Sequence, residues 1–485
     1  MSVIIVGAGP TGLMLAGDLA AAGIRVKVLE RRAEESNVTR AFALHARSLE
    51  LLAMRGLAEG LVAQGLQVAE VRPRIKGREL VFNMRHPESR FPYVLILGQA
   101  RTEAALEERA RGLGAEIVRG AEVTGLAQDG DGVTVTLAGG GSEHADYVVG
   151  CDGAHSVVRR LLSVGFSGRS YDTRILLADV LLEADLPLAV NPFIGDDGAV
   201  LLPPYGDGWF RATIWDRTRQ GVPVEEPVHL EEVRDALLRI TGRDLQLSQM
   251  RWSTRFLSER RQARRYRVGR VFLAGDAAHV HSPLGAMGMS TGLQDAANLS
   301  WKLAAACGGW APPWLLDTYE SERHPVGRMV LRLTDLLRRM SEAPAPVRLI
   351  RPYVAPAIIN HPRVSEAARL TLSGLGVTYP VPAAVADSPL AGSRVPDLPL
   401  TIGGRPARLY DYLGDGRFVL LDATGAQVVD EWRHGRVRVL ECDGPLLFGK
   451  ASTVLMRPDG YAAWTASYPE PARTREVLRQ WCGPV

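Results

Sequence analysis

Three glycines near the start of the chain have the spacing of a loop that binds a pyrophosphate. Gly7, Gly9 and Gly12 form a Gly-x-Gly-x-x-Gly pattern directly after the β-branched run 3–6. In such a loop the first glycine permits a tight turn, the second lets the backbone approach the phosphates, and the third allows close helix packing. Glu30 ends the next predicted strand, where an acid binds ribose hydroxyls and disfavours a 2′-phosphate. The pattern predicts FAD or NAD, rather than NADP, at this site.

Two later segments place an aspartate after a predicted buried strand. Residues 152–159 read Asp-Gly-x-x-Ser-x-x-Arg, and residues 275–279 read Gly-Asp-Ala-Ala-His and lead into a glycine-rich turn over 283–292. An aspartate there can accept hydrogen bonds from sugar or ribityl hydroxyls. A Gly/Pro turn can bring backbone N–H groups to the edge of an electron-rich ring. Each segment alone also fits an ordinary turn with a helix cap.

Other residues of reactive type have simpler interpretations. His279 and His281 lie two residues apart, but no carboxylate or cysteine at ligand spacing joins them, so no metal site is expected. Ser156 lacks a Gly-x-Ser-x-Gly elbow and is expected to cap a turn. The 4 cysteines include no Cys-x-x-Cys pair, which predicts reduced thiols without a zinc or thiol-redox role.

These motifs require a scaffold of strands and helices. A strand over 3–6, a helix over 13–22 and a strand over 25–30 form a βαβ unit around the glycine loop. From about 166 to 258 the pattern changes to strand-like pieces, which predicts a sheet module inserted into the first domain. Further helices are expected at 102–113, 228–240, 290–306 and 313–340, and further strands at 116–126, 132–137, 145–150, 269–275, 418–421 and 437–440.

The composition favours a globular protein and gives no indication of a nucleic-acid or membrane partner. The 485 residues carry 57 Lys+Arg and 54 Asp+Glu, a net charge of +3, which is too small to indicate a nucleic-acid or membrane partner. Hydrophobic residues at 46% and charged residues at 23% are typical of globular domains. No signal peptide or transmembrane segment is recognised. We therefore expect a cytoplasmic protein of several domains.

Together the motifs at 7–12, 152–159 and 275–303 resemble a known family. The last of them reads GDAAH…PxGxxGxxxGLQDAxNLxWKL. The chain resembles the single-component FAD-dependent aromatic monooxygenases of p-hydroxybenzoate hydroxylase type, and looks closest to actinobacterial polyketide hydroxylases and rifampicin monooxygenases. The resemblance continues through 316–325 and, more weakly, through 455–460 of the tail.

The resemblance implies an α/β architecture of three parts. A Rossmann-like FAD-binding domain would carry an inserted β-sheet substrate domain and be followed by a thioredoxin-like C-terminal domain without Cys-x-x-Cys. That last domain would be redox-inert and serve packing or oligomerisation, and a homodimer is left open. The expected boundaries are 1–72, 96–165 and 266–373 for the FAD-binding domain, 73–95 and 166–265 for the substrate domain, 374–396 for a linker, and 397–485 for the C-terminal domain.

The resemblance also implies roles for individual residues. Glu30 would bind the adenosine ribose, Asp276 would hold the ribityl chain, and the backbone around 288–290 would face the pyrimidine edge of the flavin. The set expected at FAD is Gly7, Gly9, Pro10, Thr11, Gly12, Glu30, Arg31, Arg40, Gln99, Val123, Asp152, Gly275, Asp276, Pro283, Gly285, Gly288, Met289 and Ser290. The set expected at the substrate is Phe210, Arg211, Phe256 and Pro283, although core packing is an alternative for the aromatic residues.

The implied reaction is hydroxylation of a bulky aromatic substrate, of polyketide type, through a flavin C4a-hydroperoxide. NADPH or NADH and O2 would be co-substrates, and no catalytic side chain is expected because the flavin carries the chemistry. Baeyer–Villiger or ring-opening oxygenation is an alternative within the family. Two other classes are weighed as well. One is a flavin-free NAD-dependent dehydrogenase; the other is a non-catalytic FAD-binding protein, suggested by Ala286, Met287 and Ser290, which replace Gly, Gln and Asn of the family turn.

Overall fold

A six-stranded, mostly parallel sheet forms the centre of the computed structural model, which describes residues 1–34, 41–382, 388–425 and 435–483. Its strands are short, and their apolar residues are buried in the main hydrophobic core of the protein. The order β10-β2-β1-β14-β22-β21 is that of a doubly wound dinucleotide fold. The strands are β1 (Ser2–Val6), β2 (Arg25–Glu30), β10 (Glu116–Arg119), β14 (Tyr147–Gly150), β22 (Val271–Leu273) and the antiparallel β21 (Arg267–Val268).

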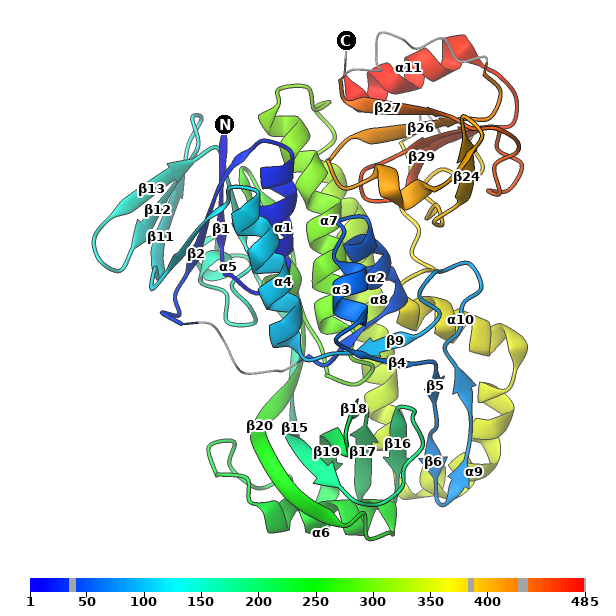
Figure 1. Ribbon diagram of the computed structural model, residues 1–485. Helices are drawn as coiled ribbons and strands as arrows, with labels where there is room; N and C mark the ends of the chain where they lie inside the picture. Colours follow the sequence, from blue (N-terminus) through cyan, green and yellow to red (C-terminus); the bar gives the residue numbers. More distant parts are fainter. Residues whose placement is uncertain (35–40, 383–387, 426–434, 484–485) are drawn as a thin grey trace.

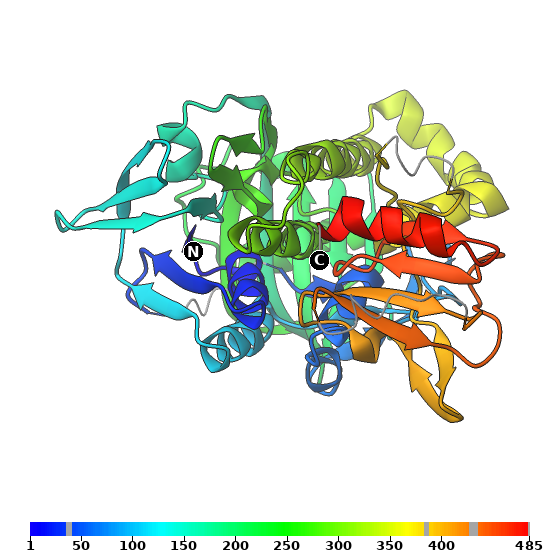
Figure 2. The same ribbon diagram turned by 90° about the horizontal axis from the view of Figure 1, so that it is seen from above.

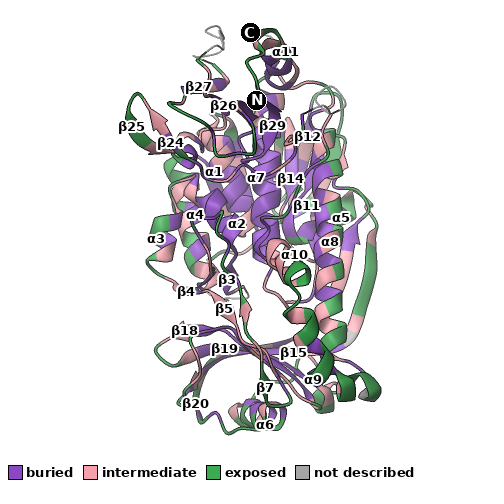
Figure 3. Ribbon diagram, turned by 90° about the vertical axis from the view of Figure 1, so that its right-hand side faces the viewer, coloured by how far each residue is buried: buried purple, intermediate pink, exposed green. Residues whose placement is uncertain are grey.

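Helix α1 (Pro10–Ala21) packs between α4 (Gln99–Gly112) and α7 (Gly288–Cys307) beside this sheet (Figure 1). Helix α7 is buried along nearly its whole length, and α8 (Asp317–Ser341) packs against it (Figure 3). The smaller elements around them are α2 (Ala46–Ala53), α3 (Ala58–Val62), α5 (Val157–Leu161), β3 (Ala43–Leu44), β4 (Leu66–Val68), β9 (Val94–Ile96), β11 (Val123–Gln128), β12 (Val133–Leu137) and β13 (Ser142–Ala145).

A second, nine-stranded sheet lies beyond the carboxyl ends of the first sheet's strands (Figure 1). Its two longest strands, β15 (Phe166–Leu182) and β20 (Leu247–Ala263), pair antiparallel, and α6 (Leu230–Thr241) covers its outer face. The short β23 (His279–Val280) joins the edge of this sheet, so the two sheets are connected directly. The other strands are β6 (Arg74–Ile75), β7 (Arg78–Glu79), β16 (Asn191–Ile194), β17 (Gly198–Leu202), β18 (Pro204–Gly206) and β19 (Trp209–Asp216), while β5 (Glu70–Val71) and β8 (Phe82–Asn83) pair separately.

The C-terminal region contains a four-stranded sheet in the order β27-β26-β28-β29. Strands β26 (Phe418–Asp422) and β27 (Val437–Glu441) are parallel, whereas β28 (Thr453–Met456) and β29 (Ala462–Ala466) are antiparallel additions. The sheet and helix α11 (Pro471–Cys482) lie against the central helices, as the view from above shows (Figure 2). The hairpin of β24 (Pro399–Ile402) and β25 (Arg405–Arg408) completes this region.

Several predicted boundaries need correction. Helix α7 begins at Gly288 rather than at 290, and α8 begins at Asp317 rather than at 313. No element was predicted where the structure has helices α9 (Ala345–Ile359) and α10 (Pro362–Ser373), and α9 has prolines in its interior. The predicted linker at 374–396 is no exposed tether where it is described, since Val377, Tyr379 and Val395 are buried. None of the described helices is long and apolar enough to cross a membrane.

Candidate active site

The three sequence motifs meet at the carboxyl edge of the parallel sheet. A Cβ placed on Gly7 would lie 2.4 Å from the carbonyl oxygen of Cys151, so the glycine loop touches the segment that begins the second motif. A Cβ on Gly275 would lie 2.6 Å from Oγ1 of Thr11, so the third motif packs against the start of α1. Residues far apart in the sequence thus form one edge, which is where doubly wound sheets bind ligands.

The three glycines of the loop have different reasons to be glycine. Gly7 has φ +106°, and a Cβ on Gly12 would lie 2.1 Å from the carbonyl oxygen of Gly7, so the protein's own backbone requires both. A Cβ on Gly9 would meet nothing within 4 Å. The space in front of Gly9 is therefore open, and it faces the N-terminus of α1, where backbone N–H groups favour a phosphate.

Glu30 lies at the end of β2 and is already held in place. Its carboxylate accepts a 2.8 Å hydrogen bond from the backbone N–H of Ala8 and bonds of 2.8 and 3.0 Å from Nε and N–H of Arg32. Burial disfavours the charged form, but these donors outweigh it and hold the pKa of Glu30 below its ordinary value. An ionised, positioned carboxylate is suited to bind ribose hydroxyls.

The two motif aspartates differ in their partners. Oδ2 of Asp152 accepts hydrogen bonds from the N–H groups of Val157 and Val158 and caps α5, while its buried Oδ1 has no partner among the described residues. Asp276 is exposed and makes no hydrogen bond to any described residue. Ser156 accepts a 3.0 Å bond from the N–H of Arg159, so its predicted capping role is confirmed. Asp276 is thus the carboxylate available to a ligand's hydroxyls.

The glycine-rich turn leads from β23 into α7 and is held by a histidine. Gly285 has φ +89°, and Ala286 also lies in the left-handed region with φ +50°. The carbonyl oxygen of Gly285 accepts a 3.0 Å hydrogen bond from Nε2 of His45. The backbone N–H of His45 donates to Oγ of Ser290 at 3.4 Å. Because α7 begins at residue 288, the N–H groups of its first turn have no partner within the helix and can face a ligand.

A buried hydrogen-bond network fixes the backbone in front of Asp276. Asp295 on α7 accepts bonds from the N–H of Gly275 at 3.0 Å, from Nε2 of His279 at 2.6 Å and from Nε of Arg323 at 2.6 Å. Arg323 also donates to the hydroxyl of Tyr379 at 3.0 Å. Burial raises the pKa of Asp295, but the charges and hydrogen bonds of Arg323 and His279 together outweigh burial and lower it overall. The network therefore fixes the position of the backbone that carries Asp276.

Sequence reasoning missed these supporting residues. His45, Asp295 and Arg323 belong to no simple catalytic motif, although the last two lie within the segments that carry the family resemblance. A signal was nevertheless present in α7. Asp295 and Lys302 are the charged residues of an otherwise uncharged, alanine-rich helix, a pattern that indicates buried polar groups with dedicated partners.

The remaining predicted FAD residues occupy varied positions. Gln99 begins α4, accepts a 3.0 Å bond from the N–H of Ala41 and donates to Glu103 at 2.8 Å. Val123 is buried in β11, next to the segment that bonds the carbonyl of Glu30. Arg31 is exposed directly after β2. Arg40 lies outside the described residues.

The large sheet separates the predicted substrate residues between its two faces. Phe210 packs with α6 in the apolar cluster on the outer face, so its assignment to the substrate site is corrected. Arg211, next along β19, lies on the other face in a buried ion pair with Asp179, with 2.5 Å between Nε and Oδ1. Its guanidinium lies 4.8 Å from the ring centre of Trp252, and Phe256 lies further along β20 on this face.

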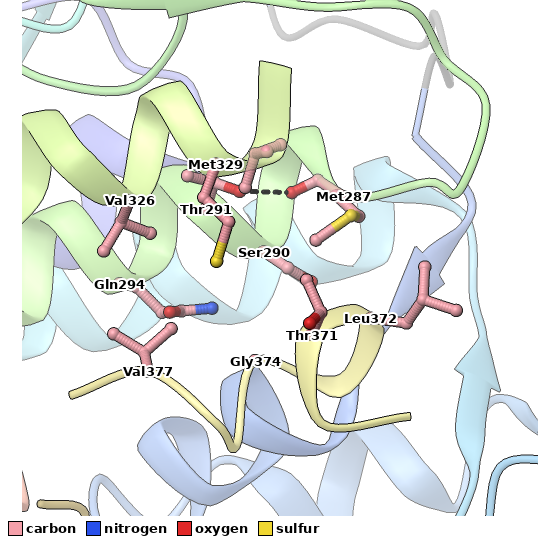
Figure 4. A pocket seen from close by; sticks show the side chains of 11 residues that line it. Met287, Ser290, Thr291, Gln294, Val326, Met329, Thr371, Leu372, Gly374 and Val377 are labelled. Carbon is pink, nitrogen blue, oxygen red and sulfur yellow. Dashed lines mark hydrogen bonds between the residues drawn. The ribbon is translucent and has the colours of Figure 1, made fainter. Parts of the chain in front are cut away.

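This inner face of the sheet reaches the glycine-rich turn. Leu201 and Tyr205 of the sheet module, Ala286 of the turn and Leu372 of α10 all pack against one buried apolar cluster that comes largely from β3, β4 and β9. A small, mostly apolar pocket lies on the other side of the turn, where Ser290 and neighbouring residues of α7 face α8 and α10 (Figure 4). The turn is therefore flanked by apolar surface. Within the described ranges no cluster of three or more His, Cys, Asp or Glu could hold a metal.

The comparisons with known families agree with this geometry. Residues 1–334 match the family described as FAD binding domain, and residues 388–485 match the one described as Aromatic-ring hydroxylase, C-terminal. Fold and site thus define a flavoprotein oxidoreductase. The chain belongs to the FAD-dependent aromatic-ring monooxygenases, as its motifs predict.

Relatives of known name cover the chain from end to end. Rifampicin monooxygenase of Streptomyces venezuelae is 40% identical over 99% of this chain and 98% of its own length. The solved structure of OxyS anhydrotetracycline hydroxylase from Streptomyces rimosus is 37% identical with a TM-score of 0.86, covering 100% of this chain and 99% of its own. Dialkyldecalin synthase of Streptomyces rugosporus is 36% identical over 100% of this chain and 99% of its length.

Proposed function

We propose that this monooxygenase hydroxylates a multi-ring aromatic substrate of polyketide type, with NADPH or NADH and O2 as co-substrates. One observation carries the proposal: the turn that begins α7 lies between the nucleotide-binding edge and an apolar, aromatic sheet face. A flat ring bound at the first can therefore face a flat substrate bound on the second. The hydroxylase and monooxygenase names of relatives that match the whole chain support this substrate class.

The residues present fit FAD. The open space before Gly9 and the N-terminus of α1 suit the pyrophosphate, Glu30 suits the adenosine ribose, and Asp276 suits the ribityl hydroxyls. N–H groups of the first turn of α7 suit the ring edge on which negative charge develops. When bound, FAD supplies the electron transfer and the activation of O2. The predicted hydroperoxide route, which also serves Baeyer–Villiger chemistry, stays part of the proposal.

The protein's own task is to orient the substrate and exclude water. The inner sheet face offers aromatic rings for stacking, with Arg211 and Asp179 fixed between them as a pair. Leu201 and Tyr205 pack against the same apolar cluster as Ala286 of the turn. A dry, shaped surface of this kind protects a reactive oxygen donor from water and places the reacting carbon.

The test combines a spectrum with product masses. Purified protein should show flavin absorption bands, and polycyclic phenols or quinones should accelerate its oxidation of NADPH or NADH. A product heavier by one oxygen supports monooxygenation. Because a Baeyer–Villiger product gains the same mass, NMR then distinguishes a new hydroxyl on an aromatic carbon, which supports hydroxylation, from a lactone or ester, which supports the Baeyer–Villiger alternative. Because one relative bears a synthase name, incorporation of ¹⁸O from labelled O2 is measured directly. Unchanged aromatics with uncoupled NADPH oxidation would contradict the proposal.

We also propose that the C-terminal region is a thioredoxin-like domain without redox activity, bounded as the sequence predicts. Its strand order and directions support this fold. Burial raises the pKa of Cys482 far above its ordinary value and that of Cys442 to about 11, so neither thiol is a ready nucleophile. Activity should therefore be insensitive to dithiols, and turnover that requires a dithiol would contradict this.

A further inference from the structure

Helix α2 connects the C-terminal domain to the glycine-rich turn. His45, which precedes the helix, is buried, and burial lowers its pKa, so the ring is neutral at neutral pH. Because a carbonyl oxygen only accepts, Nε2 of His45 must carry the proton that it donates to Gly285 at 3.0 Å. The hydroxyl of Ser48, one turn later, donates to the carbonyl oxygen of Ser290 at 3.5 Å. Helix α2 thus contacts both ends of the turn.

The other side of α2 is held by a loop of the C-terminal domain. Arg47 is fully buried and donates from Nη2 to the backbone oxygen of Asp459 at 2.6 Å. Its guanidinium lies 5.0 Å from the ring centre of Tyr461 and pairs with Glu50 at 2.9 Å. Gly460 has φ +84°, and a Cβ there would lie 2.9 Å from Nη2 of Arg47. The loop is shaped to receive this arginine.

The same loop also supports the network behind Asp276. Arg457 forms a bidentate ion pair with Glu322, with distances of 2.8 and 2.9 Å, and Glu322 directly precedes Arg323 on α8. The ring of Tyr379, whose hydroxyl accepts from Arg323, stacks on Tyr461 with centres 4.2 Å apart. This loop of the C-terminal domain therefore contacts both the helix α2, which holds the glycine-rich turn, and the residues around Arg323, which hold the backbone at Asp276.

We propose that the loop Arg457–Tyr461 positions the flavin-facing turn through Arg47 and His45. The inference rests on the proposed function, because it assigns a role to the turn toward FAD. The physical need arises from Ala286, whose left-handed backbone is unfavourable for any residue with a Cβ and persists only when its surroundings hold it. His45 and Arg47 are positioning residues, and through them the C-terminal domain supports the cofactor site.

The test compares variants of the full-length protein, with and without FAD. His45→Ala and Arg47→Met should each weaken FAD binding to the apoprotein at least about tenfold, since each removes a buried hydrogen bond that orders the turn. They should also speed amide hydrogen exchange of the peptide 283–292 in the apoprotein. His45→Gln keeps an N–H donor and should restore both quantities. Leu478→Ala is the matched control, because it weakens the core of the C-terminal domain without removing a contact to α2.

The outcomes separate the inference from the proposed function. FAD uptake by the unmodified protein, together with NADPH oxidation stimulated by aromatic compounds, tests the proposed function. The FAD affinities and exchange rates of the variants, relative to the unmodified protein, test the supporting role of the C-terminal domain. Exchange and FAD affinity that change in His45→Ala and Arg47→Met but not in Leu478→Ala support the inference. Unchanged values in the two variants, or equal changes in Leu478→Ala, would overturn it.

Discussion

Two regions of the molecule are rich in charged and polar residues but differ in how their polar groups are satisfied. At the nucleotide edge, Asp276 is exposed without a hydrogen-bond partner among the described residues, Oδ1 of Asp152 has none, and the space before Gly9 is open. At the junction with the C-terminal domain, Glu322 is buried and both its oxygens accept bonds from Arg457. Unsatisfied groups at an open edge mark a place for a ligand, whereas a closed network marks a structural joint.

The joint shows how burial and pairing compete. Burial disfavours the charge on Glu322, but Arg457 and Lys302 outweigh it and lower the pKa of Glu322 to about 2. Lys302 has the opposite balance: burial dominates and lowers its pKa to about 8, despite the nearby carboxylate. The joint is therefore stable only when every buried charge has a partner. Removing one partner leaves the others as unpaired buried charges, which lowers the stability of the protein.

The largest effect is expected from Arg457→Met, which leaves the carboxylates of Glu322 and Asp459 without their main partner. Breaking a buried pair in this way costs about 3–5 kcal/mol. Urea unfolding followed by tryptophan fluorescence measures the loss. Arg417→Met is the control: it removes one side of an ion pair with Asp415 in which both side chains are more than one third exposed, and it should cost at most about 1 kcal/mol. Similar losses for both variants would refute the distinction between joint and surface.

The glycine loop contains both kinds of position within six residues: one that faces open space for a ligand and one that packs against the protein itself. Gly12→Ala forces a Cβ against the carbonyl of Gly7 and should destabilise the apoprotein by about 1–3 kcal/mol. Gly9→Ala meets no protein atom, so the apoprotein should keep its melting temperature while FAD affinity falls. Calorimetry of the apoproteins and FAD titration check both. A Gly9→Ala apoprotein as unstable as Gly12→Ala would show that the open space is misassigned.

Asp276→Asn should weaken FAD binding about tenfold or more, because a charge-assisted hydrogen bond contributes about 1.5–3 kcal/mol. The melting temperature of the apoprotein should not change, since Asp276 bonds to no described residue. Asp295→Asn is the contrast: it should lower both FAD affinity and stability, because Asp295 is buried with three donors. Fluorescence titration and calorimetry distinguish the two results.

The smallest effect, taken over one pH unit, is a pH dependence at the joint. The pKa of Lys302 is about 8 in the folded protein and about 10.4 when unfolded, so between these values the unfolded state binds more protons. Stability relative to Lys302→Met should therefore rise with pH in this window and be lost again as pH falls through about 8. The expected rise approaches about 1.4 kcal/mol for each pH unit between the two pKa values. Unfolding of both proteins at a series of pH values measures it, and a constant difference would contradict the low pKa.

Prediction from sequence succeeded where local pattern and spacing carry the information. The βαβ unit around Gly7–Gly12 and the family assignment follow from residues close together in the chain. It gave no prediction for α9 and α10. Interior prolines weaken the helical signal of α9, whereas the proline of α10 lies in its first turn, where proline is tolerated. Phe210 was misassigned because strand alternation shows that Phe210 and Arg211 face opposite ways, but not which face α6 covers.

What the sequence determined by itself is the chemistry of the nucleotide edge. Glycines at fixed spacing, a strand-ending acid and a strand-ending Asp276 act through short-range geometry that any local stretch of chain reveals. Only the tertiary structure decided what supports that edge. His45, Asp295 and Arg457 act on atoms 16 to 240 positions away along the chain, or on a different domain. Contacts at such separations depend on how whole elements pack, and neither composition nor spacing encodes that packing locally.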